Sequence, residues 1–228
     1  MQVHGESICR DDLSEQTMAL VKSRISLRAD IHPFQKNVFG SVAGLVHPAD
    51  CRERDTLIIT CSELGVAPDY ISFGTPERFL FLQHIAGSIP SKAECEASDG
   101  LCCDGIEKLF GKYEFRHVIV CGHLDCGVIA RWLLPAEAGV RDAGDFRRRF
   151  ETGTRKLVDN NYFPISSSER LRLMIFEHVL CQIENLLTHS FVSERVRAGM
   201  TSFYGWVVDD ESARVFGYCP DESAFSHI

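Results

Sequence analysis

Two short apolar runs, each followed by side chains that can bind a metal, constrain the fold of this chain most. The first covers residues 57–61 (LIITC), and the second covers residues 117–121 (HVIVC) and leads into Gly122-His123. Both are brief and rich in β-branched residues, which is typical of strands buried on both faces of a parallel sheet. A third run at residues 79–82 (FLFL) predicts another strand.

Helical patterns lie on either side of these strands. We predict a helix over residues 98–111, with Ser98 as its N-cap and Gly111 at its end, and a longer one over residues 168–190 that Ser168 can cap. Residues 12–30 have apolar positions at helical spacing and predict an N-terminal amphipathic helix.

Near the C-terminus, residues 205–209 and 214–218 predict an antiparallel hairpin. Alternating strands and helices define an α/β fold with a mostly parallel central sheet flanked by helices, an N-terminal helical extension and a C-terminal hairpin. We expect residues 1–34 to form a helical arm and residues 35–228 to form one domain.

Composition excludes several classes of function. The net charge of -8 argues against a nucleic-acid partner, which needs a basic face. The sequence has no run of eighteen apolar residues, so we expect no membrane span. The polar first residues (MQVHGESICRDD) do not resemble a signal peptide. We therefore expect a cytoplasmic protein whose ten cysteines are mostly reduced, so that some can bind a metal or take part in catalysis.

Two of these cysteines and one histidine form a candidate metal site. Cys61 lies at the end of the first predicted strand, and His123 and Cys126 follow the second. Ligands in parallel sheets bind outside the carboxyl ends of the strands. Two thiolates and an imidazole with an open fourth position are typical of catalytic zinc. The alternative is a buried Cys61, a helix-capping His123 and a Cys126 without a special role.

Residues 57–90 and 117–132 resemble the two signature regions of the β-carbonic anhydrases, which read C-x-D-S-R followed by R-N-A-G-N, and G-H-x-x-C-G. The sequence GWVVD at residues 205–209 is similar too, and the resemblance covers most of residues 35–220. It implies that Cys61, His123 and Cys126 bind Zn²⁺. It also implies a lyase that hydrates CO₂ reversibly to bicarbonate, and a homodimer or a dimer of dimers.

The chain departs from that family at polar positions. The family's aspartate and arginine, which together orient the attacking hydroxide, align with Glu63 and Gly65. The resemblance then implies that Glu63 is the catalytic carboxylate. Because Gly65 offers no charge to hold it, we expect Glu63 to pair with nothing but the metal, which it could also coordinate.

Further changes follow in the next region, where the family's arginine and asparagine align with His84 and Ile85. His84 is a candidate proton shuttle, since the pKa of histidine suits that role, or a polar filler beside a loop. By the same resemblance Gly65, Ala86, Gly87 and Gly127 would line the substrate.

Three other functions stay open at this point. The chain could be a zinc hydrolase of carbonyl sulfide or carbon disulfide, a non-catalytic zinc or bicarbonate-binding protein, or a metal-free hydrolase using Cys61 and His123. Among the remaining residues, we expect Asp125 either to support the metal ligands or to be exposed. We expect Arg147-Arg148-Arg149 to form a solvated helix face, and Cys102 and Cys103 to have no more than a minor redox or metal role.

Overall fold

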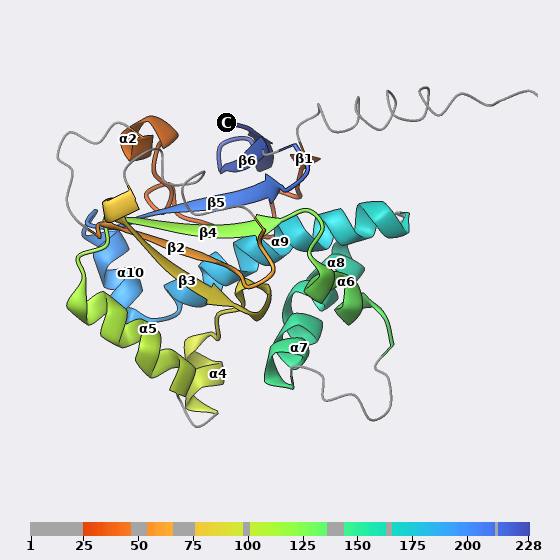
Figure 1. The fold of residues 1–228 in the computed structure, drawn as a ribbon, viewed down its shortest axis with the longest axis horizontal. Helices are drawn as coiled ribbons and strands as arrows, with labels where there is room; N and C mark the ends of the chain where they lie inside the picture. The colour runs from red at the N-terminus through yellow and green to blue at the C-terminus, as the bar shows by residue number, and fades with distance from the viewer. Residues whose placement is uncertain are drawn as a thin grey trace, which may run out of the picture.

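The computed structural model describes residues 25–46, 54–65, 76–97, 101–135, 144–162, 166–212 and 214–228. A seven-stranded sheet in the order β1-β7-β6-β5-β4-β2-β3 forms the centre of the molecule (Figure 1). Its strands are β1 (Ile25–Ser26), β2 (Thr56–Cys61), β3 (Phe79–His84), β4 (His117–His123), β5 (Ser202–Asp209), β6 (Arg214–Cys219) and β7 (Ala224–His227).

The sheet is mixed. The pairs β3–β2, β2–β4 and β4–β5 are parallel, whereas the pairs β5–β6, β6–β7 and β7–β1 are antiparallel. The α/β class and the C-terminal hairpin are thus confirmed. The expectation of a mostly parallel sheet holds only for one half, because the hairpin continues into β7 and residues 25 and 26 pair with residues 225 and 224.

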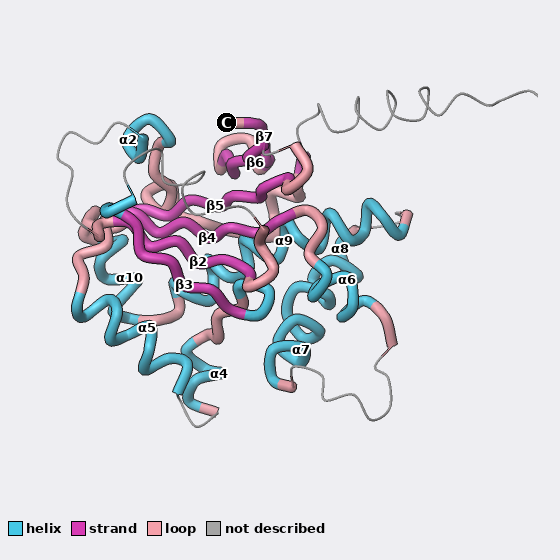
Figure 2. Tube along the Cα trace, viewed as in Figure 1, coloured by secondary structure: helices cyan, strands magenta, loops and turns pink. Residues whose placement is uncertain are grey.

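Helices cover the sheet mainly on one face, as the tube drawing shows (Figure 2). The longest, α9 (Ser167–Leu187), packs against β4 and β5. Gly122 and Gly205 allow this close approach, because a Cβ at either position would lie 3.0 or 3.3 Å from side-chain carbons of Val179. The other helical segments are α2 (Val42–Val46), η1 (Pro76–Arg78), η2 (Ile85–Gly87), α4 (Lys92–Glu96), α5 (Leu101–Lys112), α6 (Gly127–Leu133), α7 (Asp145–Phe150), η3 (Glu151–Arg155), α8 (Lys156–Asn161) and α10 (Ser190–Arg197).

Alternation along the strands divides the apolar side chains between two cores. Leu57 and Ile59 of β2 belong to the large core beneath α9, whereas Ile58 between them belongs to a smaller cluster on the opposite face. Leu45 of α2 packs into that second cluster together with Trp206 of β5. Burial on both faces explains why these strands read as continuous apolar runs.

Several local predictions need correction. Most of the predicted helix over residues 12–30 lies outside the described residues, and Ile25–Ser26 at its end forms strand β1. The N-cap of α9 is Ser166 rather than Ser168, in a capping box with Glu169. Of the three arginines expected on a solvated face, only Arg148 is exposed. Arg147 is buried and bonds the Leu134 carbonyl oxygen and Glu151, and the side chain of Arg149 is only 10% exposed.

The cysteines that the structure describes fall into two states. Cys61, Cys121, Cys126, Cys181 and Cys219 are free thiols, and Cys121 is buried in the second core. Cys95 of α4 is disulfide-bonded, so the expectation of reduced thiols does not extend to it. None of the helices in the described ranges combines the length and apolar character that a bilayer crossing requires.

Candidate metal centre

The carboxyl ends of β2 and β4 bring the candidate ligands together. Cys61 is the last residue of β2 and His123 the last of β4, and the two strands pair in parallel. Cys126 is the N-cap residue of α6, one turn after His123. One potential ligand atom from each of Cys61, Glu63, His123 and Cys126 lies within 4.8 Å of the others, and we refer to these four residues as the metal cluster.

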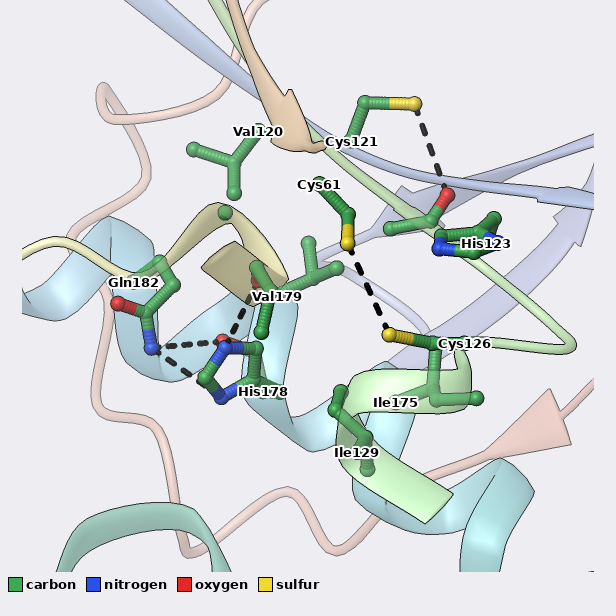
Figure 3. Close-up of a pocket in the computed structure, with 13 residues that line it drawn as sticks. Cys61, Val120, Cys121, His123, Cys126, Ile129, Ile175, His178, Val179 and Gln182 are labelled. Carbon is green, nitrogen blue, oxygen red and sulfur yellow. Dashed lines mark hydrogen bonds between the residues drawn. The ribbon is translucent and has the colours of Figure 1, made fainter. Parts of the chain in front are cut away.

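The two sulfur atoms have the spacing that a tetrahedral zinc site requires. Cys61 Sγ and Cys126 Sγ are 3.8 Å apart and point toward one another (Figure 3). Zinc–sulfur bonds of about 2.3 Å at a tetrahedral angle put two thiolates about 3.8 Å apart. The pair therefore fits a shared metal ion without rearrangement.

The ring of His123 is oriented by a carboxylate. Its Nδ1 lies 3.1 Å from Oδ2 of Asp210, whereas its Nε2 is buried and has no hydrogen-bond partner among the described residues. A buried ring nitrogen without a partner is costly unless it binds something. A carboxylate behind a histidine is the usual support of a metal-binding imidazole. The donor set and its orientation thus fit Zn²⁺.

Electrostatics favour a thiolate at Cys61. The hydrogen bond with Cys126, together with nearby His123, lowers the pKa of Cys61 to about 5, against the opposite effect of burial. Cys61 and burial raise the pKa of Cys126. Burial lowers the pKa of His123, but Cys61 and Asp210 outweigh it and the net shift is upward. One of the two sulfurs is therefore already in the form that binds metals.

Glu63 has a second partner that the sequence did not indicate. Its Oε2 accepts a hydrogen bond from the backbone N–H of Val128 at 3.0 Å, at the start of α6. A Cβ at Gly127 would lie 3.0 Å from the same oxygen, so glycine leaves room for the carboxylate there. The expectation that Glu63 pairs with nothing but a metal is wrong.

A small cavity of about 10 Å³ lies beside the cluster, on the side facing α9. Ala86 and Gly87 line it, together with apolar side chains and with His178 and Gln182 of α9 (Figure 3). Such a volume suits roughly one water molecule. Ala86 has a φ of 55° and Gly87 a φ of 64°, and the ring of His178 contacts the Ala86 carbonyl oxygen at 3.1 Å.

The other predicted residues lie around the cluster. His84 pairs with Cys61 in the β2–β3 register and is half-buried, and burial lowers its pKa, but it does not line the cavity. Gly65 is exposed, and no atom of the described residues lies within 4 Å of a Cβ built there. Asp125 is exposed as well. The side chains of Cys102 and Cys103 lie outside the described residues.

Sequence reasoning missed three groups. Asp210 was placed in a hairpin turn, although its position just after a strand next to β4 could have indicated it. The N–H of Val128 has no side-chain signature. His178 lies inside the strong apolar pattern of α9, where a polar residue is the available signal.

Two solved structures have the same architecture as this chain. The β-carbonic anhydrase CcaA superposes with a TM-score of 0.67 at 24% identity, covering 78% of each chain. One of two tetrameric β-carbonic anhydrases from Sordaria macrospora gives a TM-score of 0.58 at 18% identity, covering 73% of this chain and 81% of its own. These likenesses show the fold.

Sequence comparison then shows the family. The profile described as carbonic anhydrase matches residues 56–215, which include all four residues of the metal cluster. The carbonic anhydrase of Synechococcus elongatus is 27% identical over 199 residues, covering 86% of this chain and 69% of its own. This chain belongs to the β-carbonic anhydrase family, a family of lyases.

Proposed function

We propose that the protein binds one Zn²⁺ through Cys61, His123 and Cys126 and catalyses the reversible hydration of CO₂ to bicarbonate. The observation that carries this is the cysteine pair, 3.8 Å apart, beside a buried His123 Nε2 that has no other partner among the described residues. When bound, zinc supplies Lewis-acid chemistry and lowers the pKa of water to about 7.

Glu63 orients the reacting water in this proposal. The N–H of Val128 fixes one carboxylate oxygen, which leaves the other free to accept a hydrogen bond from water at the cluster. The Val128 N–H therefore holds the carboxylate of Glu63 in place, as the family's arginine holds the aspartate.

His84 is the proposed proton carrier. Burial lowers its pKa, so its ring is neutral near pH 7 and can accept a proton. It lies at the end of β3, next to the end of β2 that carries Cys61. Gly65, Ala86, Gly87 and Gly127 complete the proposed substrate surface, since they add little bulk near the cluster.

Metal content and two rate assays on the same samples test the proposal. We expect one zinc per chain in the wild type and loss of most of it in Cys61→Ser. The matched control is Cys219→Ser, which removes a half-buried free thiol of β6 outside the cluster. Zinc near the wild-type level in Cys61→Ser would refute the ligand assignment.

The rate assays compare CO₂ hydration with hydrolysis of carbonyl sulfide and carbon disulfide. We expect CO₂ hydration that disappears with the zinc. A zinc-loaded protein that acts on the sulfur compounds alone would be a related hydrolase. One that acts on neither would be a binding protein, and either outcome contradicts the proposed activity.

We also propose a homodimer or a dimer of dimers. The support is family membership, together with the Sordaria macrospora structures that are described as tetrameric. Light scattering at micromolar concentration tests this, and a monomer would contradict it.

A further inference from the structure

A second and larger cavity lies on the far side of His178 and Gln182 from the metal cluster. It has a volume of about 320 Å³ and is bordered by α4, η3 and α9. His178 and Gln182 line both cavities and so form a common wall. This volume falls in the range of small-molecule sites, which start near 300 Å³.

Arg149 of α7 lines this cavity, and its Nε donor has no hydrogen-bond acceptor among the described residues. Its side chain is only 10% exposed, and its Nε is buried without a hydrogen-bond partner among the described residues. The nearest carboxylate oxygen, Oε1 of Glu94, is 4.0 Å away, and the guanidinium lies over the ring of Phe146. An arginine Nε carries one N–H donor, and leaving it without an acceptor in a buried place is costly.

The two acidic residues that line the cavity are already engaged elsewhere. Oε2 of Glu94 accepts hydrogen bonds from the N–H and the hydroxyl of Ser91, at 2.7 and 3.0 Å, in the capping box of α4. Oε1 of Glu184 lies 2.9 Å from Nδ1 of His32. Neither carboxylate therefore accepts a hydrogen bond from Arg149 Nε, and Glu94 offers it only an ion pair at 4.0 Å.

We propose that this cavity binds a small planar oxyanion of the carboxylate kind through Arg149. The planar fork of arginine matches a carboxylate with two parallel hydrogen bonds. The hydroxyl-bearing Ser88 and Thr152 line the same space, and Phe150 and Leu157 offer apolar contact to a short carbon chain.

The charges around the cavity select the ligand further. Glu94 and Glu184 disfavour a second negative charge, so the site takes a monoanion. Both an organic monocarboxylate and bicarbonate have the required shape and charge. The inference does not depend on the metal cluster, because none of the proposed metal ligands lines this cavity.

Saturation-transfer NMR with lactate as the probe tests the proposal on the full chain. We expect saturable binding to the wild type and at least a tenfold weaker affinity in Arg149→Gln. The matched control is Arg148→Gln, whose side chain is 66% exposed and pairs with Asp145 on the surface. The control should bind lactate as the wild type does. Equal affinity in Arg149→Gln, or no binding to the wild type, overturns the proposal.

Two further measurements complete the design. Bicarbonate and acetate are each added as competitors of lactate. If bicarbonate displaces lactate at the lower concentration, the site is assigned to bicarbonate. If acetate does so, the site is assigned to an organic acid. Should Arg149→Gln not fold by circular dichroism, the wild type decides instead. An arginine Nε–H signal that moves on addition of lactate supports the site, and arginine signals that all stay fixed overturn it.

Discussion

At the scale of single residues, Glu63 has a backbone partner where the family resemblance gives its carboxylate a side-chain partner. The family resemblance gives position 65 to an arginine that clamps the carboxylate, and this chain has glycine there. The structure supplies a donor from Val128 instead, at 3.0 Å. We infer that the clamp has moved from a side chain to the start of α6.

Restoring the family's pair of residues tests this inference. Glu63→Asp shortens the side chain by one methylene and withdraws it from Val128, so we expect CO₂ hydration to fall by about tenfold or more. Gly65→Arg alone should change little, because Glu63 is already held. In the double variant the arginine can hold the aspartate bidentately, and activity should return to the wild-type level or above.

The backbone at Gly65 permits this experiment. Its φ is not in the left-handed region, and a built Cβ meets no atom of the described residues within 4 Å, so a side chain can begin there without backbone strain. Activity that merely adds the effects of the two single variants would show that residues 63 and 65 act independently. Zinc content must match across the four proteins.

Asp210 supports the proposed ligand His123 and should matter for metal affinity. We predict that Asp210→Asn weakens zinc binding by about 10- to 100-fold, the usual effect of removing the carboxylate behind a metal-binding histidine. Competition with a coloured chelator measures this. Glu211→Gln, one position further along the same turn, is the control and should bind zinc normally.

The sequence predicted the cluster but not its supports. Cys61, His123 and Cys126 follow recognisable strands and match a family motif, so their neighbourhood could be predicted. Asp210 is 87 residues from His123 in sequence, and only the pairing of β4 with β5 brings the two together. A long-range contact of this kind has no local pattern.

At the scale of elements, the N-terminus of α9 depends on one serine. Ser166 accepts a hydrogen bond from the Glu169 N–H, and Glu169 reaches back to the Ser166 N–H. We predict that Ser166→Ala costs about 1 kcal/mol of the free energy of unfolding. In a chain of this size, that lowers the melting temperature by about 2–4 °C.

Ser168→Ala is the matched control for that prediction. Ser168 lies within α9, where alanine has the better helix propensity, so the melting temperature should stay the same or rise slightly. Calorimetry on both variants decides. A larger loss in Ser168→Ala than in Ser166→Ala would contradict the assigned cap.

Elements with strong patterns were predictable, and their ends and environments were not. The apolar runs of β2, β3 and β4 indicated strands because burial on both faces requires continuous apolar sequence. Three consecutive serines precede Glu169, and the pattern alone does not choose among them. Arg147 looked solvated because its acceptor, the Leu134 carbonyl oxygen, belongs to a different segment.

At the scale of the whole molecule, His32 ties the segment between β1 and α2 to α9. Its Nε2 lies 2.5 Å from Oε2 of Glu177, and Glu184 contacts the other ring nitrogen. Burial alone lowers the pKa of His32, but hydrogen bonds to the two carboxylates outweigh this effect and raise it to about 9.

This shift predicts how stability depends on pH. A histidine whose pKa is higher in the folded state contributes stability that is fully present below its unfolded value, near 6.5, and is lost as pH rises through about 9. We therefore expect the free energy of unfolding to decrease between about pH 6.5 and pH 9. Urea unfolding across this range measures it.

His32→Gln keeps a polar side chain but does not titrate. The variant should be less stable at pH 6.5, and its stability should vary less up to pH 9 than that of the wild type. A pH profile as steep as that of the wild type would assign the titration to another group.

The contact between Glu63 and the backbone of Val128 also bears on how such a site can change over evolutionary time. A donor that belongs to the main chain is encoded by no particular codon, and every residue type except proline preserves it at position 128. Mutational drift can therefore exchange the side chain there, within the limits set by its packing against the large core, while the carboxylate stays anchored. A search for the family's signature side chains would find no partner for the Glu63 carboxylate, whereas the helix whose backbone N–H holds it is inherited with the fold.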